Sequence, residues 1–134
     1  SKSVLLVADE NRRRLGVEAE FRQSDLFAQV QGVYDRILSN PPYIPSGVIG
    51  TLMEEVRDHE PVLALDGGED GLRCYREIIQ ESPGYLKPGG MLFLEIGYDQ
   101  AESVAGLMER DFTGIRVVKD LAGLCRVVYG SRKP

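Results

Sequence analysis

Hydrophobic and polar residues follow two different periods along this chain, and together they predict a mixed α/β domain. Apolar residues at helical spacing mark helices at residues 1–15, 72–79 and 99–110. Period-two alternation and short apolar runs mark strands between and after them. The predicted strands are residues 17–23, 33–38, 91–96, 115–118 and 126–129. Helices mixed with strands, and two adjacent strands at the end, favour an α/β fold with an antiparallel ending.

Local signals refine the ends of these elements. Gly16 is placed to cap the first helix, and residues 87–90 (Lys-Pro-Gly-Gly) predict a turn. The nearly continuous apolar run 91–96 is typical of a strand buried on both faces of a parallel sheet. Asp99 and Glu102 have the spacing of a capping box for the last helix. Too few residues separate the last two strands for a helical crossover, so we expect them to pair antiparallel.

Composition narrows the class of protein. The 134 residues, 43% of them apolar and 28% charged, suit one folded globular domain. The longest apolar run is far shorter than the roughly 20 residues of a membrane helix, so we expect no membrane partner. Two cysteines can build neither a disulfide framework nor a zinc site by themselves. A reducing, cytoplasmic location is therefore the default expectation.

The net charge of −5 is concentrated in one segment. Residues 54–70 hold seven acidic residues and one arginine, a sum of −6, so the rest of the chain sums to +1. This distribution lacks the basic stripe of a nucleic-acid-binding protein. The segment lies within residues 44–71, an irregular stretch long enough to be a binding loop or a lid. The acidic residues between Glu54 and Glu60 could bind a basic partner surface, or could only order the loop.

The tetrapeptide Asn40-Pro41-Pro42-Tyr43 is the strongest chemical signal, because it follows directly on a predicted strand. In open α/β sheets, ligands bind at the carboxyl ends of strands. The side-chain oxygen of Asn40 and the carbonyl of Pro41 can both accept hydrogen bonds from one planar NH2 group. The two prolines restrict the backbone, so these acceptors are preorganised.

This arrangement suits chemistry at an amide nitrogen. Such a nitrogen is a poor nucleophile, because its lone pair is delocalised into the carbonyl. Two acceptors that hold its hydrogens away from the new bond would favour the pyramidal, attacking form. The ring of Tyr43 could lie against the flat substrate group and near a cationic methyl donor, where a cation–π contact contributes roughly 0.5–2 kcal/mol.

The run 39–45 (Ser-Asn-Pro-Pro-Tyr-Ile-Pro) resembles motif IV of amino-methyltransferases that use S-adenosylmethionine. Several other segments are similar to the HemK/PrmC family, the glutamine N5-methyltransferases of peptide-chain release factors. These segments are residues 24–27, 55–61, 64–72, 120–123 and 126–128. The Asn-Pro-Pro-Tyr (NPPY) motif is shared with DNA and RNA methyltransferases, whereas the acidic loop and the closing hairpin narrow the resemblance to the glutamine enzymes.

The resemblance covers essentially the whole chain and implies a fold. We expect a partial Rossmann-like class I methyltransferase fold, with a mostly parallel sheet and a carboxyl-terminal antiparallel hairpin. Residues 1–134 would form the carboxyl-terminal part of the catalytic domain. The family's first strands, its glycine-rich loop and the acidic residue that holds the ribose match nothing in this chain. We therefore expect a piece of a larger protein, in which residues 17–23 lack their usual neighbour.

The same resemblance implies an activity and a site. The full-length protein would transfer a methyl group from S-adenosylmethionine to a glutamine side chain of a release factor, whereas the isolated piece would be inactive. Asp25 and Leu26 match positions beside the adenine of the cofactor, and Asn40 also lies near the cofactor. No metal takes part. The catalytic residues, which would hold the glutamine amide, are Asn40, Pro41, Pro42 and Tyr43.

Two other functions remain open. A nucleic-acid amino-methyltransferase could use the same pocket for an exocyclic amine, although the charge of −5 argues against a nucleic-acid partner. Alternatively, the piece is catalytically silent and associates with itself, because unpaired strand edges favour a homodimer or strand exchange.

Overall fold

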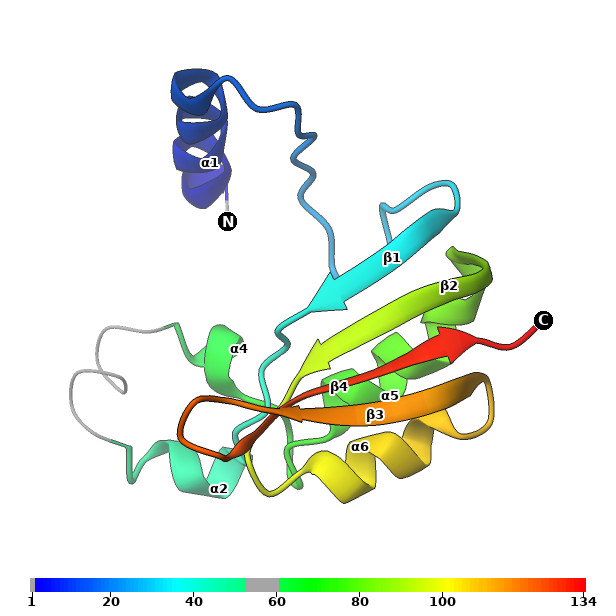
Figure 1. The fold of residues 1–134 in the computed structure, drawn as a ribbon. Coiled ribbons are helices and arrows are strands. Elements are labelled where there is room, and N and C mark those ends of the chain that lie inside the picture. Colours follow the sequence, from blue (N-terminus) through cyan, green and yellow to red (C-terminus); the bar gives the residue numbers. More distant parts are fainter. Residues whose placement is uncertain (1, 53–60) are drawn as a thin grey trace. The chain divides into compact units, whose positions relative to one another are not determined.

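The computed structural model describes residues 2–52 and 61–134, which belong to two compact units. The first unit, Ser1–Gly32, holds the helix α1 (Lys2–Leu15), and the second unit is Val33–Pro134 (Figure 1). None of the helices in these described ranges is long and apolar enough to cross a membrane. The predicted site motif lies in the second unit, which we therefore describe in more detail.

The helix of the first unit ends where the sequence predicts. The amide of Gly16 donates to the carbonyl of Arg13 (3.3 Å), and that of Val17 donates to Arg12 (3.2 Å), which is the pattern of a Schellman cap. Gly16 has a φ of +64°, which glycine adopts without strain. The predicted strand at residues 17–23 is wrong, since these residues lie outside any helix or strand. The described part of the first unit contains no strand with which these residues could pair.

A sheet forms the centre of the second unit, with four strands in the part of the chain that the structure describes, in the order β1-β2-β4-β3. The strands are β1 (Tyr34–Ser39), β2 (Leu86–Glu95), β3 (Phe112–Lys119) and β4 (Cys125–Arg132). β1 pairs parallel with β2, and the other two pairings are antiparallel. The α/β class and the antiparallel ending are therefore confirmed, whereas the described sheet is not mostly parallel, because only one of its three pairings is parallel.

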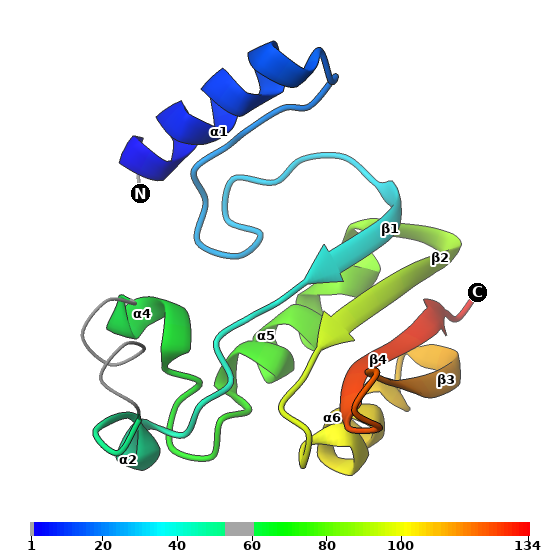
Figure 2. The same cartoon turned by 60° about the vertical axis from the view of Figure 1, so that its left-hand side comes forward.

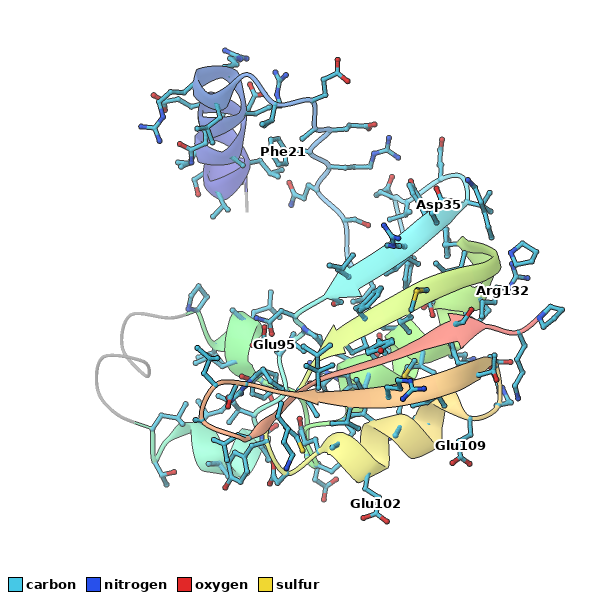
Figure 3. The ribbon with its side chains drawn as sticks, viewed as in Figure 1. Phe21, Asp35, Glu95, Glu102, Glu109 and Arg132 are labelled. Carbon is cyan, nitrogen blue, oxygen red and sulfur yellow. The ribbon has the colours of Figure 1, made fainter. Side chains whose placement is uncertain are left out.

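Two helices, α5 (Arg73–Glu81) and α6 (Ala101–Met108), lie on one face of this sheet (Figures 1 and 2). Figure 3 shows Glu102 and Glu109 projecting from the α6 region on the side away from the sheet. The largest fully buried apolar side chains are Tyr75, Leu86, Leu92, Leu94, Ile96, Val104, Met108, Phe112 and Val128. The core of the second unit is thus the layer between the two helices and the sheet.

β2 alternates in burial along its length. Leu92 and Leu94 are fully buried, whereas Met91 and Phe93 are only partly buried. The ring of Phe93 stacks on Tyr129, with ring centroids 5.2 Å apart. The prediction of a strand buried on both faces is therefore wrong, because within the described second unit α5 and α6 cover the same face.

The turn predicted at residues 87–90 lies inside β2 and not ahead of it. Leu86 is opposite Tyr34, and the next paired residue, Met91, is opposite Arg36. Three more residues therefore separate the paired positions on β2 than on β1. The Pro-Gly-Gly sequence does bend the chain, but it makes an irregularity within the strand.

The predicted capping box of Asp99 and Glu102 is wrong. α6 begins after Gln100, and no side chain caps its amides. The side chain of Gln100 is instead used by the preceding turn, where its oxygen accepts the N–H of Gly97 (3.0 Å). The entry to this helix is determined by that turn, which lies beyond the end of β2.

The irregular stretch 44–71 contains two single-turn helices in its described parts. They are α2 (Ser46–Ile49) and α4 (Val62–Leu65). Residues 54–60, which carry part of the predicted acidic segment, lie outside the described residues.

Candidate functional site

The NPPY motif leaves the carboxyl end of β1, beside the parallel strand β2. Ser39, the last residue of β1, is opposite Leu94. Asn40 is exposed, Pro41 is buried and Tyr43 is half-buried. The prediction that the motif follows a strand is confirmed. The exposed residue Asn40 lies at the carboxyl end of β1, and α/β proteins bind ligands at the carboxyl ends of their strands.

The chain after the motif is hydrogen-bonded to the segment that precedes α5. The amide of Ile44 donates to the carbonyl of Leu65 (3.0 Å), and the amide of Gly67 donates to the carbonyl of Ile44 (2.9 Å). One residue pair further on, the amide of Ser46 donates to the carbonyl of Gly68 (2.9 Å). The motif therefore runs between two pieces of paired backbone, β1 before it and this short ladder after it.

Two acidic side chains of the segment before α5 have bonded partners, Asp66 at this junction and Asp70 at the start of α5. Oδ1 of Asp66 accepts the hydroxyl of Ser46 (2.6 Å) and the N–H of Gly68 (2.9 Å), and these bonds hold the pKa of Asp66 below its ordinary value. The guanidinium of Arg76 pairs with Asp70 and lowers its pKa to about 2. These bonds show how Asp66 and Asp70 are held, and the two roles left open for residues 54–60 stay a prediction, because those residues lie outside the described ones.

A buried glutamine connects the motif with two further loops. Gln100 is 9% exposed. Its Nε2 donates to the carbonyls of Tyr43 (3.0 Å) and Gly71 (3.3 Å), and its Oε1 accepts the N–H of Gly97 (3.0 Å). Sequence analysis missed this residue. The available signal was its place just after β2, because the loops at the carboxyl ends of adjacent parallel strands meet.

A hollow of about 490 Å³ is lined by Tyr43 together with Tyr98 and Arg126, among others. Arg126 donates to Oδ2 of Asp120 (3.2 and 3.3 Å) and to the carbonyl of Ile96 (3.4 Å). The hydrogen bond to Asp120 raises the pKa of this guanidinium, which therefore stays charged. Tyr98 comes from the loop after β2 and Arg126 from β4, so the sequence pattern alone did not select these two residues.

A second hollow, of about 380 Å³, is lined by Asn40 and by side chains of β1, β2 and β4. Leu38 and Phe93 make its wall largely apolar, and Glu95 adds a carboxylate. Asn40 and Tyr43, the first and last residues of the motif, therefore line different hollows. In the described part of the chain, no group of three or more His, Cys, Asp or Glu residues could hold a metal ion.

The two residues predicted beside the cofactor belong to the first unit. Asp25 is exposed and Leu26 is partly buried, both in the turn that follows residues 17–24. The hydroxyl of Ser24 donates to the carbonyl of Leu26 and accepts the amide of Gln29, both at 2.9 Å. Leu26 has a φ of +43°, which is uncommon for a residue other than glycine. Their association with Asn40 stays a prediction from the sequence.

Comparisons with known proteins point to one family. The family described as methyltransferase small domain matches residues 1–56. A release factor glutamine methyltransferase of Caulobacter vibrioides is 54% identical over 102 residues, which are 75% of this chain and 35% of that relative. Another, of Gloeobacter violaceus, is 44% identical over 133 residues, which are 96% of this chain and 46% of that relative. The chain thus spans less than half the length of each of these two curated relatives.

A solved structure shows the same fold. The crystal structure of a methyltransferase from Pyrococcus furiosus matches 100% of this chain and 60% of its own chain, with a TM-score of 0.70. The sequences are 15% identical, so this likeness concerns the fold alone. It agrees with the α/β methyltransferase fold predicted from the sequence.

Proposed function

Because this chain belongs to the HemK/PrmC family of glutamine methyltransferases, we propose that residues 1–134 are the carboxyl-terminal part of a catalytic domain. The full-length protein methylates the side-chain amide of a glutamine in a peptide-chain release factor. One observation carries this proposal. The NPPY motif leaves the end of a parallel strand with Asn40 exposed and with paired backbone on both of its sides.

The motif binds the amide of the substrate through acceptors. Oδ1 of Asn40 and the carbonyl of Pro41 accept the two hydrogens of the NH2 group, and Tyr43 contacts its flat face. Because both hydrogens are held, the nitrogen lone pair is directed away from them. The same acceptors, or water, take up the proton that the nitrogen loses. The protein therefore contributes orientation and proton acceptance, which together favour the attacking form of the amide.

The hollow lined by Asn40 suits S-adenosylmethionine. When bound, this cofactor supplies a methyl group on a positively charged sulfur. A volume of about 380 Å³ falls within the range of small-molecule sites, and the wall of Leu38 and Phe93 is apolar. The carboxylate of Glu95 and the amide oxygen of Asn40 favour a positive charge there. Asp25 and Leu26 would lie beside the adenine, as the family resemblance implies.

The test is methyl transfer by the full-length product of the gene that encodes this chain. Mass spectrometry should show the gain of one methyl group on the glutamine of a Gly-Gly-Gln release-factor peptide. Asn40→Ala should lower the rate by about 100-fold, a typical effect of removing one preorganised hydrogen-bonding group. Asn11→Ala, which changes an exposed asparagine of α1, is the matched control and should keep the rate. No methyl gain on the peptide, with methylation of adenine-containing DNA instead, would overturn the proposal in favour of a nucleic-acid enzyme.

One observation favours the second candidate, self-association of residues 1–134. β1 lies at an edge of the described sheet, and its Leu38 is 75% exposed. An edge strand that exposes apolar side chains is a template for pairing with another chain. Sedimentation of this chain should then show a dimer that Leu38→Lys converts to a monomer. A monomer at all concentrations would refute this candidate without touching the methyltransferase proposal.

A further inference from the structure

Gln100 is the one described glutamine whose side chain is buried, and it satisfies its hydrogen-bonding groups from three loops. Its amide nitrogen donates to the carbonyls of Tyr43 and Gly71, and its oxygen accepts from Gly97. These groups belong to the NPPY loop, the loop before α5 and the turn after β2. A buried amide with its hydrogens and its oxygen bonded is a rigid connection, because breaking it leaves buried carbonyls unpaired.

Glycines make room for this connection. A Cβ on Gly97 would lie 2.9 Å from Oε1 of Gln100, and a Cβ on Gly71 would lie 2.8 Å from its Nε2. A Cβ on Gly67 would lie 2.8 Å from the Cα of Tyr43. Side chains at these three positions would therefore push the loops away from the amide or from each other. Gly67 and Gly71 thus serve the close approach of backbones, and Gly97 leaves room for the amide oxygen.

Gln100 bonds to the motif directly after its two prolines, where few backbone N–H groups are present to form hydrogen bonds. Pro41 and Pro42 have no N–H groups, so this part of the loop cannot be held through two of its amides. The carbonyl of Tyr43 remains available, and Gln100 binds it from a position 57 residues away. The plane of the peptide that joins Tyr43 to Ile44 is thereby fixed from outside the loop.

We propose that Gln100 is a positioning residue for methyl transfer, which holds the Tyr43 carbonyl and so orients the acceptors of Asn40 and Pro41 toward the substrate amide. This inference rests on the proposed function, since it assigns those acceptors to a glutamine amide. Gln100 itself does not need to touch the substrate. Its effect passes through the backbone of the motif, where a displacement of about 1 Å can lower a rate by about 100-fold.

Gln100→Glu in the full-length product is the sharpest variant, because it keeps the size of the side chain and replaces its NH2 group. As a carboxylate, the new group repels the carbonyls of Tyr43 and Gly71. When protonated, it can donate one hydrogen bond again. We therefore expect kcat for the Gly-Gly-Gln peptide to fall by about 100-fold at alkaline pH, with KM within about threefold of the wild type. The ratio of variant to wild-type kcat should rise as the pH is lowered.

Gln80→Glu is the matched control, since it makes the same exchange at an exposed position of α5. It should follow the wild-type pH profile. A Gln100→Glu variant that keeps its kcat, or that loses stability while its kcat ratio stays constant with pH, would overturn the inference and leave the proposed function intact. A wild-type enzyme that leaves the peptide unmethylated would overturn the proposed function instead.

A second measurement on residues 1–134 needs no activity. In Gln100→Met, hydrogen exchange should become at least tenfold faster at the amides of Gly97 and Ile44, which bond to Gln100 and to Leu65. Exchange within β4 should stay unchanged, and Gln80→Met should alter none of these amides. Unchanged exchange at Gly97 and Ile44 would show that Gln100 does not hold the loop, which refutes the positioning role.

Discussion

Gly71→Ala tests how tightly the loops around the motif are packed. Gly71 has a φ of +73°, a left-handed conformation that residues with a Cβ rarely adopt. The added methyl group would collide with the carbonyl oxygen of Tyr43 and would lie 2.8 Å from Nε2 of Gln100. Either the backbone of Tyr43 or the side chain of Gln100 must move, and the hydrogen bond between them is then lost.

The size of the effect follows from two contributions. The left-handed conformation costs about 1–2 kcal/mol for a residue other than glycine. The broken hydrogen bond at Gln100 adds about 0.5–1.5 kcal/mol, or more if a buried carbonyl stays unpaired. We therefore expect the free energy of unfolding to fall by about 1.5–3.5 kcal/mol. With a denaturant dependence of about 2 kcal/mol per molar urea, the unfolding midpoint drops by roughly 1–2 M.

Gly89→Ala isolates the conformational contribution. Gly89 has a φ of +77°, close to that of Gly71, but nothing lies within 4 Å of its added Cβ. This variant should therefore lose only the conformational part, about 1–2 kcal/mol. Urea unfolding of residues 1–134, followed by circular dichroism, measures both variants against the wild type. Equal losses for the two variants would refute the reasoning that the loops are in close contact at Gly71.

Three further predictions concern the core and the hairpin. Leu92→Ala removes a fully buried side chain and should lower the free energy of unfolding by about 2–5 kcal/mol, as measured by thermal unfolding. Its control is Leu38→Ala, at a 75% exposed position, which should change that free energy by no more than about 0.5 kcal/mol. Tyr75→Phe removes a buried hydroxyl that donates to the last carbonyl of β2 (2.8 Å), so a loss of about 0.5–1.5 kcal/mol is expected in urea, and an unchanged midpoint would contradict that bond. Hydrogen bonds from the N–H of Leu124 and from other donors hold the pKa of Asp120 below its ordinary value of 3.8. The ionised carboxylate therefore stabilises the folded state above pH 3.8, and this stabilisation is lost as the pH falls through the lowered pKa. Asp120→Asn should accordingly destabilise the protein near neutral pH and much less near pH 2, and an equal effect at both would contradict the assignment.

Local sequence signals predicted the elements whose causes are local. Three predictions depend on residues close in sequence and are confirmed: the glycine cap of α1, a strand at the apolar run of β2, and the antiparallel pairing of β3 with β4. The strand predicted at residues 17–23 is wrong for the opposite reason. Alternating apolar and polar residues are typical of a strand, but a strand also requires a neighbouring strand whose N–H and C=O groups form hydrogen bonds with it.

The sequence by itself determined the α/β class and the position of the NPPY motif after a strand. Both depend on local effects, because hydrophobic periodicity and the restriction of the backbone by two consecutive prolines each involve only residues close in sequence. Only the tertiary structure showed that Gln100 binds the carbonyl of Tyr43 and that Gly67, Gly71 and Gly97 leave space for it. These contacts join segments that meet because β1 and β2 are parallel neighbours, so their following loops emerge at the same end of the sheet. The pattern of residues along the chain predicts the local structure of each segment, whereas the pairing of the strands determines which segments come into contact.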